Sequence, residues 1–212
     1  MDERVGRACE QYERAIFQGD VTGLAGVDRE LNAAEAELAL ARGKLLHAHF
    51  LDGREQEDPR ELELFRRSLE LYEALGDERG RAEALFWIGC FHQVVRDDAE
   101  SALAALESSA ALARQSGDQL ILSYALRHLG IAAHREGRAD EAAQLLGEST
   151  ELRRTLGFTA GVAANLVGLV HLAIDQGRSA DAEALLAEAT TLAEAAGATA
   201  ILNQLTAARG RL

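Results

Sequence analysis

Residues 137–157 read GRADEAAQLLGESTELRRTLG, and residues 177–197, forty positions later, read GRSADAEALLAEATTLAEAAG. Both stretches begin and end with glycine and carry an alanine- and leucine-rich apolar stripe at helical spacing. The matching leucines are Leu145, Leu146 and Leu152 in the first stretch and Leu185, Leu186 and Leu192 in the second. Each stretch is therefore predicted to form one amphipathic helix. The match between them predicts that the chain is built from structural repeats.

Glycines extend this spacing beyond the two stretches. They stand at Gly117, Gly137, Gly157, Gly177 and Gly197, twenty residues apart, and Gly76 lies 41 residues before Gly117. Twenty residues accommodate a helix of about four turns and a short connection. Glycine just past a helix adopts the left-handed cap conformation at little cost, so each glycine is expected to end a helix.

The segments between the glycines alternate in kind, so the repeating unit is a pair of helices of about 40 residues. The first helices carry the bulkier stretches, and the second helices are rich in alanine and leucine. Helix starts are expected at four capping aspartates, Asp58, Asp77, Asp97 and Asp118. The predicted helices span residues 59–75, 78–95, 98–115, 119–135, 139–155, 159–175, 179–195 and 198–209.

Upstream of residue 59 the pattern is looser. A leading helix is expected over residues 2–18 and another first helix over residues 33–51, whereas residues 20–32 are either a loop or the frayed start of a long helix. Residues 54–58 are expected to form a solvated turn. No proline- or serine-rich linker divides the chain, so we expect one domain with three parts: residues 1–32 (N-terminal helix and connection), 33–197 (repeats) and 198–212 (capping helix).

Composition excludes several classes of protein. The 212 residues carry a net charge of −13, which argues against binding nucleic acid, because neutralising phosphates needs an excess of cations. No apolar run approaches the roughly 18 residues of a membrane span. The first residues lack the pattern of a signal peptide, so we expect a cytoplasmic protein. Cys9 and Cys90 are far apart and in no ligand motif, so neither a disulfide, a metal nor a cofactor is expected.

The residues resemble the tetratricopeptide repeat family over about residues 33–197. The resemblance rests on a small residue after an apolar one in the first helix, as in Leu129-Gly130 and Ile88-Gly89, and on the alanine-rich second helices. The 40-residue period is similar to the longer repeats of bacterial transcriptional regulators and signal-transduction ATPases. Val170 departs from the pattern, because a small residue is expected there. The resemblance implies an all-α, right-handed superhelix whose first helices line a concave groove that binds peptides or other ligands.

The candidate site is this groove, because all six histidines fall on expected first helices. The expected binding residues lie on those helices and are His47, Phe86, Trp87, Cys90, Gln93, Tyr124, Arg127, His128, Asn165 and His171. Cationic and aromatic side chains of this kind suit an anionic or carboxylate-bearing ligand. The alternative for Phe86 and Trp87 is packing between helices.

The leading hypothesis is an adaptor without catalytic activity that recognises a peptide segment or a partner protein. A second hypothesis is a small-molecule pocket, sensory or catalytic, closed by Trp87, Cys90 and His128, in which His128 or His171 would be the base for a Cys90 nucleophile. A third is self-association, as a homodimer for example, through the last helix. Its apolar strip comprises Ile201, Leu202 and Leu205.

Overall fold

A computed structural model describes residues 2–53 and 56–212, and within them it contains ten α-helices and no strand. The helices are α1 (Glu3–Gln18), α2 (Leu24–Leu51), α3 (Pro59–Leu75), α4 (Glu78–Val94), α5 (Ala99–Ser116), α6 (Gln119–Arg135), α7 (Ala139–Thr155), α8 (Thr159–Asp175), α9 (Ser179–Ala195) and α10 (Thr199–Arg209). All eight helices predicted from residue 59 onward are present, and their ends agree with the prediction to within one residue. The predicted all-α fold of tetratricopeptide-like helix pairs is confirmed.

The repeated glycines end helices as predicted. Gly137 has φ +78°, and the other glycines of the series, Gly76, Gly117, Gly157, Gly177 and Gly197, have φ between +63° and +72°. At the end of α6, the Gly137 N–H donates to the His134 carbonyl and the Arg138 N–H donates to the Ala133 carbonyl. These bonds satisfy carbonyls that the helix itself leaves without donors.

Three of the four predicted capping aspartates cap helices, and one does not. The side chains of Asp58, Asp77 and Asp118 accept backbone N–H bonds at the starts of α3, α4 and α6. At α5 the prediction of Asp97 is wrong, because Asp98 accepts the Ser101 N–H at 3.1 Å. Asp97 has φ +51° and belongs to the turn that follows α4, so the helix begins one residue later than predicted.

The region upstream of α3 forms a long helix. α2 starts at Leu24 and runs through residue 33, so the helical alternative for residues 20–32 holds from Leu24 onward. The first boundary predicted for the parts of the chain therefore falls inside a helix. Within the predicted turn at 54–58, residues 54 and 55 lie outside the described residues. Glu57 forms an ion pair with Arg96, at 2.5 Å between Oε1 and Nη2.

Contacts divide the chain into two compact units, residues 1–102 and 103–212, which we describe separately. In the first unit α1 packs on α2, and α2, α3 and α4 pack on one another. The α1–α2 hairpin is tied by ion pairs from Arg4 to Glu37 at 2.9 Å and from Arg7 to Glu30 at 2.7 Å. The fully buried aromatic side chains of this unit are Phe65, Phe86 and Phe91.

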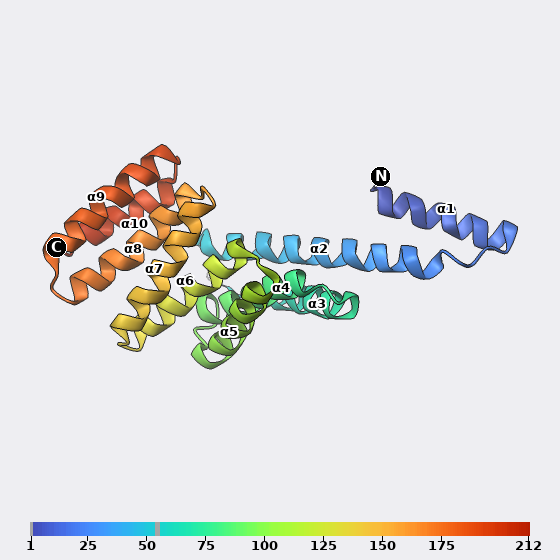
Figure 1. Cartoon of the computed structure of the whole chain (residues 1–212), viewed down its shortest axis with the longest axis horizontal. Helices are drawn as coiled ribbons and strands as arrows, with labels where there is room; N and C mark the ends of the chain where they lie inside the picture. The colour runs from blue at the N-terminus through green and yellow to red at the C-terminus, as the bar shows by residue number, and fades with distance from the viewer. Residues whose placement is uncertain (1, 54–55) are drawn as a thin grey trace. The chain divides into compact units, whose positions relative to one another are not determined.

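In the second unit, α6 pairs with α7, α8 pairs with α9, and α10 packs on both α8 and α9 (Figure 1). Gly130 allows the close approach of α6 to α7, since a Cβ at this position would lie 2.9 Å from Leu146 Cγ. The small residue predicted after Leu129 thus has a packing role. Val170, which departs from the family pattern forty residues later, is fully buried in the core of the next pair.

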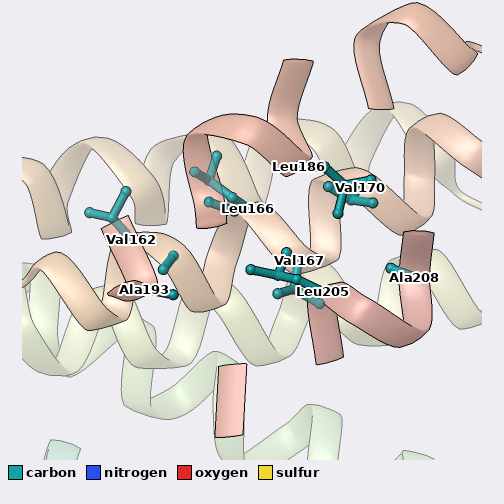
Figure 2. Packing of buried hydrophobic residues seen from close by; sticks show 10 residues of the cluster. Val162, Leu166, Val167, Val170, Leu186, Ala193, Leu205 and Ala208 are labelled. Carbon is teal, nitrogen blue, oxygen red and sulfur yellow. The ribbon is translucent and has the colours of Figure 1, made fainter. Parts of the chain in front are cut away.

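The core of the last repeats joins α8, α9 and α10 (Figure 2). Its buried side chains are Val162, Ala163, Leu166, Val167, Val170, Leu186, Ala189, Ala193, Leu205 and Ala208. Each of the larger ones contributes about 1.5–3 kcal/mol through removal of apolar surface from water. The apolar strip of the last helix belongs to this core, because Leu205 is buried and Ile201 and Leu202 pack against the cluster. Self-association through this strip stays a prediction, and within the chain these side chains already have apolar neighbours.

Candidate functional site

A depression of about 490 Å³ lies on the second unit and is lined by α6, α8 and α10 together with Arg211, which lies two residues after the end of α10. Its lining residues are Arg127, Ile131, His134, Arg135, Val167, Gly168, His171, Asp175, Gln204, Ala207 and Arg211. α6 and α8 are first helices of their pairs, and α10 takes the place of the next first helix. The resemblance to tetratricopeptide repeats implies that the first helices line the groove, and the depression lies on helices of this kind.

The depression is cationic in a chain of net charge −13. Three arginines line it, Arg127, Arg135 and Arg211, against a single carboxylate, that of Asp175. Apolar side chains, including Ile131 and Val167, complete the lining. An anionic group attached to an apolar one matches this lining in both charge and polarity.

Asp175 organises one side of the depression. Its Oδ1 accepts from Arg211 Nη2 at 2.7 Å, and its Oδ2 accepts from His134 Nε2 at 2.9 Å. Arg211 Nη1 also donates to His171 Nδ1 at 2.8 Å. The proton of neutral His171 is therefore on Nε2, and this N–H is the donor that remains for other partners.

These contacts shift two pKa values. Burial, and secondarily the positive charge of Arg211, lowers the pKa of His171, so the ring is neutral at pH 7. Burial by itself would raise the pKa of Asp175, but the hydrogen bonds from His134 and Arg211 outweigh it and hold that pKa below its ordinary value. The depression thus contains a fixed carboxylate and a neutral imidazole beside its arginines.

Behind the depression, Asn165 connects two arginines. Arg127 Nη1 donates to the Ala164 carbonyl at 2.6 Å and lies 3.4 Å from Asn165 Oδ1, and Arg153 Nη1 donates to the same Oδ1 at 2.9 Å. The Asn165 amide in turn donates to Ser149 Oγ at 2.7 Å. Because Asn165 is fully buried, its role is to hold the guanidinium groups in place.

Arg153 is 1% exposed and lies against two aromatic rings, 4.8 Å from the centroid of Tyr124 and 5.5 Å from that of Phe158. It also donates to the Gly161 carbonyl at 2.8 Å, while its Nη2 has no hydrogen-bond partner among the described residues. Burial, followed by the charge of Arg127, lowers the pKa of Arg153 to about 10, so the group is still charged at pH 7.

Arg153 is not among the site residues expected from the sequence, although its position carries a signal. It lies at the end of the stripe formed by Ala142, Leu146 and Ser149, which are spaced by four and three residues and are all buried. Ala113 and Ala193 stand forty residues before and after it and are fully buried. An arginine at a position where the neighbouring repeats have buried alanines indicates a polar centre inside this repeat.

The predicted site residues of the second unit are partly brought together. Tyr124 and Asn165 contact Arg153, and Arg127 lies beside the same Asn165 oxygen. Arg127 and His171 line the same depression. His128 is half-buried and is not among the lining residues. Gln204 and Arg211 are not among the site residues expected from the sequence, which predicts a cap or a self-association surface for the last helix rather than part of the groove.

The predicted site residues of the first unit are mainly buried. His47, Phe86, Cys90 and Gln93 are at most 7% exposed, and Trp87 is half-buried. The Trp87 ring contacts those of His47, Phe65 and Phe86, with centroids 5.1–5.8 Å apart. These side chains therefore form an aromatic cluster rather than the wall of an open groove, which agrees with the packing alternative for Phe86.

The first unit also has a depression of about 540 Å³ between α2 and α3. Its lining residues are Arg42, Leu45, Leu46, His49, Arg60, Glu63, Leu64 and Arg67. Two of its three arginines already have carboxylate partners, because Arg60 pairs with Asp58 and Arg67 with Glu35. No residue from the predicted binding set lines it.

The described residues 2–53 and 56–212 contain no group of three or more histidine, cysteine, aspartate or glutamate residues arranged to hold a metal ion. They also contain no helix with the length and apolar character needed to cross a membrane.

The comparisons with known proteins give a fold and no family. No family model matches the sequence, and no curated protein is significantly similar to it. The structure is similar to the crystal structure of aspartyl phosphate phosphatase F from Bacillus subtilis, with a TM-score of 0.67 and 10% sequence identity. The alignment covers 97% of this chain and 56% of that one, so the chain spans little more than half the length of this structural relative. At this identity the likeness shows the helical-repeat fold alone.

Proposed function

We propose that this chain is a helical-repeat adaptor that binds a partner protein through a segment carrying carboxylates. One observation carries the proposal: the α6–α8–α10 depression collects three arginines and one carboxylate in a protein of net charge −13. A surface whose charge opposes that of the chain favours an anionic partner through electrostatic complementarity. Because Asn165 and Asp175 hold Arg127 and Arg211 in place, these side chains lose little conformational entropy on binding.

The test uses charge reversal within one helical end. Arg211→Glu changes a lining residue, whereas Arg209→Glu makes the same change two residues away at a position that does not line the depression. The tagged protein is incubated with native lysate, and captured proteins are identified by mass spectrometry. We expect wild type and Arg209→Glu to capture the same partner, and Arg211→Glu to lose it.

Competition then tests the charge requirement directly. A poly-glutamate peptide is expected to release the captured partner, and a poly-lysine peptide of equal length is not. A partner retained equally by both arginine variants, or released equally by both peptides, would remove the depression from the binding surface.

A small anionic metabolite is the second candidate for the same depression. Its volume of about 490 Å³ is within the range of small-molecule pockets, about 300–1,000 Å³. A ligand that binds only the folded state raises the melting temperature. A thermal-shift screen of carboxylates and phosphates on wild type and Arg211→Glu therefore separates a metabolite sensor from a protein adaptor.

We expect the protein to be located in the cytoplasm, because its two cysteines form no disulfide.

A further inference from the structure

Three helices of the first unit place a thiol, an imidazole and a carboxylate next to one another, with the imidazole between the other two. Cys90 Sγ on α4 lies 3.6 Å from His47 Nε2 on α2, and His47 Nδ1 lies 2.8 Å from Glu61 Oε1 on α3. In the sequence these residues are 43 and 14 positions apart. From the sequence, the expected base for Cys90 is His128 or His171, whereas the structure places His47 beside it.

The order of the three groups is that of a nucleophile, a base and an orienting carboxylate. A carboxylate only accepts hydrogen bonds, so His47 Nδ1 carries the proton donated to Glu61, and Nε2 has its lone pair toward the Cys90 thiol. The carboxylate thus sets the tautomer in which Nε2 can take the thiol proton. Proton transfer from Cys90 to His47 leaves the net charge of the cluster unchanged, so burial opposes it less than it opposes an isolated thiolate.

The burial of Cys90 limits the size of any molecule that could react with its sulfur. Cys90 and His47 are each 4% exposed and Glu61 is 1% exposed. The half-buried Trp87 lies edge-on to His47, and Lys44 lies over the Trp87 ring at 5.5 Å. The cluster therefore lies beneath the partly exposed Trp87 and Lys44, and its burial excludes a protein or a bulky metabolite from the sulfur. A reagent for Cys90 must be close to water in size.

We propose that Cys90 is a thiol that reacts with hydrogen peroxide, with His47 as its base and Glu61 as the positioning residue. The Cys90 proton moves to His47 Nε2, and the thiolate attacks one peroxide oxygen. An S–O bond forms as the O–O bond breaks, and the leaving hydroxide takes the proton from His47 to become water. The sulfur is oxidised to a sulfenic acid, and the peroxide is reduced to water and the hydroxyl now on sulfur.

Cys9 supplies the internal control, because it is exposed on α1, outside this cluster. The protein is treated with hydrogen peroxide for timed intervals, and catalase then removes the peroxide. The protein is next unfolded in urea that contains dimedone, which traps sulfenic acids, so that both cysteines are equally accessible to the trap. Labelling at each cysteine is followed by peptide mass spectrometry. The ratio of the Cys90 rate to the Cys9 rate is measured in the native protein and in concentrated urea, where both are ordinary thiols. We expect the native ratio to exceed the unfolded ratio by about tenfold or more, given the usual effect of a positioned base.

Two variants test the roles of the partners. His47→Gln is expected to abolish the native excess, and Glu61→Gln to reduce it severalfold, while the matched control His49→Gln, at an exposed position of the same helix, leaves it unchanged. Circular dichroism checks that the variants fold. If His47→Gln does not fold, the wild-type ratio measured as a function of pH decides, because a thiol paired with a base keeps its rate at acidic pH better than Cys9 does. A native ratio at or below the unfolded ratio, or one that His47→Gln leaves intact, overturns the proposal.

Discussion

Arg153 is the residue at which the chain departs most from its own repeat. The equivalent positions are Ala113 and Ala193, both fully buried, whereas Arg153 places a guanidinium group in the same interior. Its hydrogen bonds go to neutral oxygens, among them Asn165 Oδ1 and the Gly161 carbonyl. The guanidinium group of Arg153 holds Asn165 in place and, through it, Arg127 at the edge of the depression.

Replacing Arg153 by methionine is expected to destabilise the protein by about 2–4 kcal/mol, because buried acceptors lose their charged donor. Arg154→Met is the matched control, since Arg154 lies in exposed ion pairs with Glu151 and Glu188 that are worth at most about 1 kcal/mol. Urea unfolding measures both variants. Equal stability of the two would contradict the structural role given to Arg153.

A second residue-scale prediction concerns His171, whose pKa in the folded state lies below its ordinary value of 6.5 because of burial and Arg211. Arg211, Asp175 and His134 face it. Between the folded and unfolded pKa values the unfolded chain binds more protons, so the free energy of unfolding decreases as pH falls from about 7 toward 5. His171→Gln removes this contribution.

The measurement is urea unfolding across that pH range. We expect a shallower pH dependence in His171→Gln than in wild type. His92 in the first unit has its pKa lowered in the same direction by burial, so some dependence remains in both proteins. Identical slopes would show that His171 does not couple folding to protonation.

At the scale of the element, the helices were predictable because their limits depend on local chemistry. Glycine has access to positive φ, and aspartate accepts the first backbone N–H groups, wherever they occur in the chain. The one wrong cap has a local cause, because the turn after α4 shifts the cap from Asp97 to Asp98. The choice between loop and helix for residues 20–32 stayed open in the sequence, and there α2 begins at Leu24 and packs against α1.

Replacing Gly137 and Gly147, which lie ten residues apart, by alanine should change the stability of the protein in opposite directions. Gly137, at the end of α6, has φ +78° with open space around its Cβ position, so Gly137→Ala is expected to cost about 1–2 kcal/mol of backbone strain. Gly147 lies inside α7, also with open space, so Gly147→Ala should stabilise by about 0.5–1 kcal/mol. Thermal unfolding of both variants measures the change in melting temperature. Changes of the same sign would contradict the roles given to Gly137 as a positive-φ cap and to Gly147 as an interior helix residue.

At the scale of the whole molecule, charge is the dominant property. The chain has 35 acidic residues against 22 lysines and arginines, so its compact state is subject to self-repulsion. Many of its ion pairs join exposed side chains, for example Arg114 with Glu148, and each of these contributes little. We therefore expect long-range repulsion to affect the salt dependence of stability more than the exposed ion pairs do.

Raising the ionic strength from about 0.01 M to about 0.1 M shortens the screening length from about 30 Å to about 10 Å. We expect the melting temperature to rise over this range, because repulsion is screened more than short ion pairs are. Differential scanning calorimetry at fixed pH gives the measurement. A melting temperature that falls with added salt would mean that the exposed ion pairs contribute more than the net charge.

The sequence by itself determined the all-α architecture, the forty-residue period and nearly every helix end, since these depend on caps, glycines and periodicity within a few residues. It also placed Arg127 and His171 on first helices. Only the tertiary structure decided which polar groups meet: Arg211 with Asp175, Arg153 with Asn165, and His47 with Cys90 and Glu61. The reason is geometric. Successive residues of a helix point about 100° apart, so a side chain's neighbours depend on how each helix is rotated against the next, and this rotation is set by packing across the core.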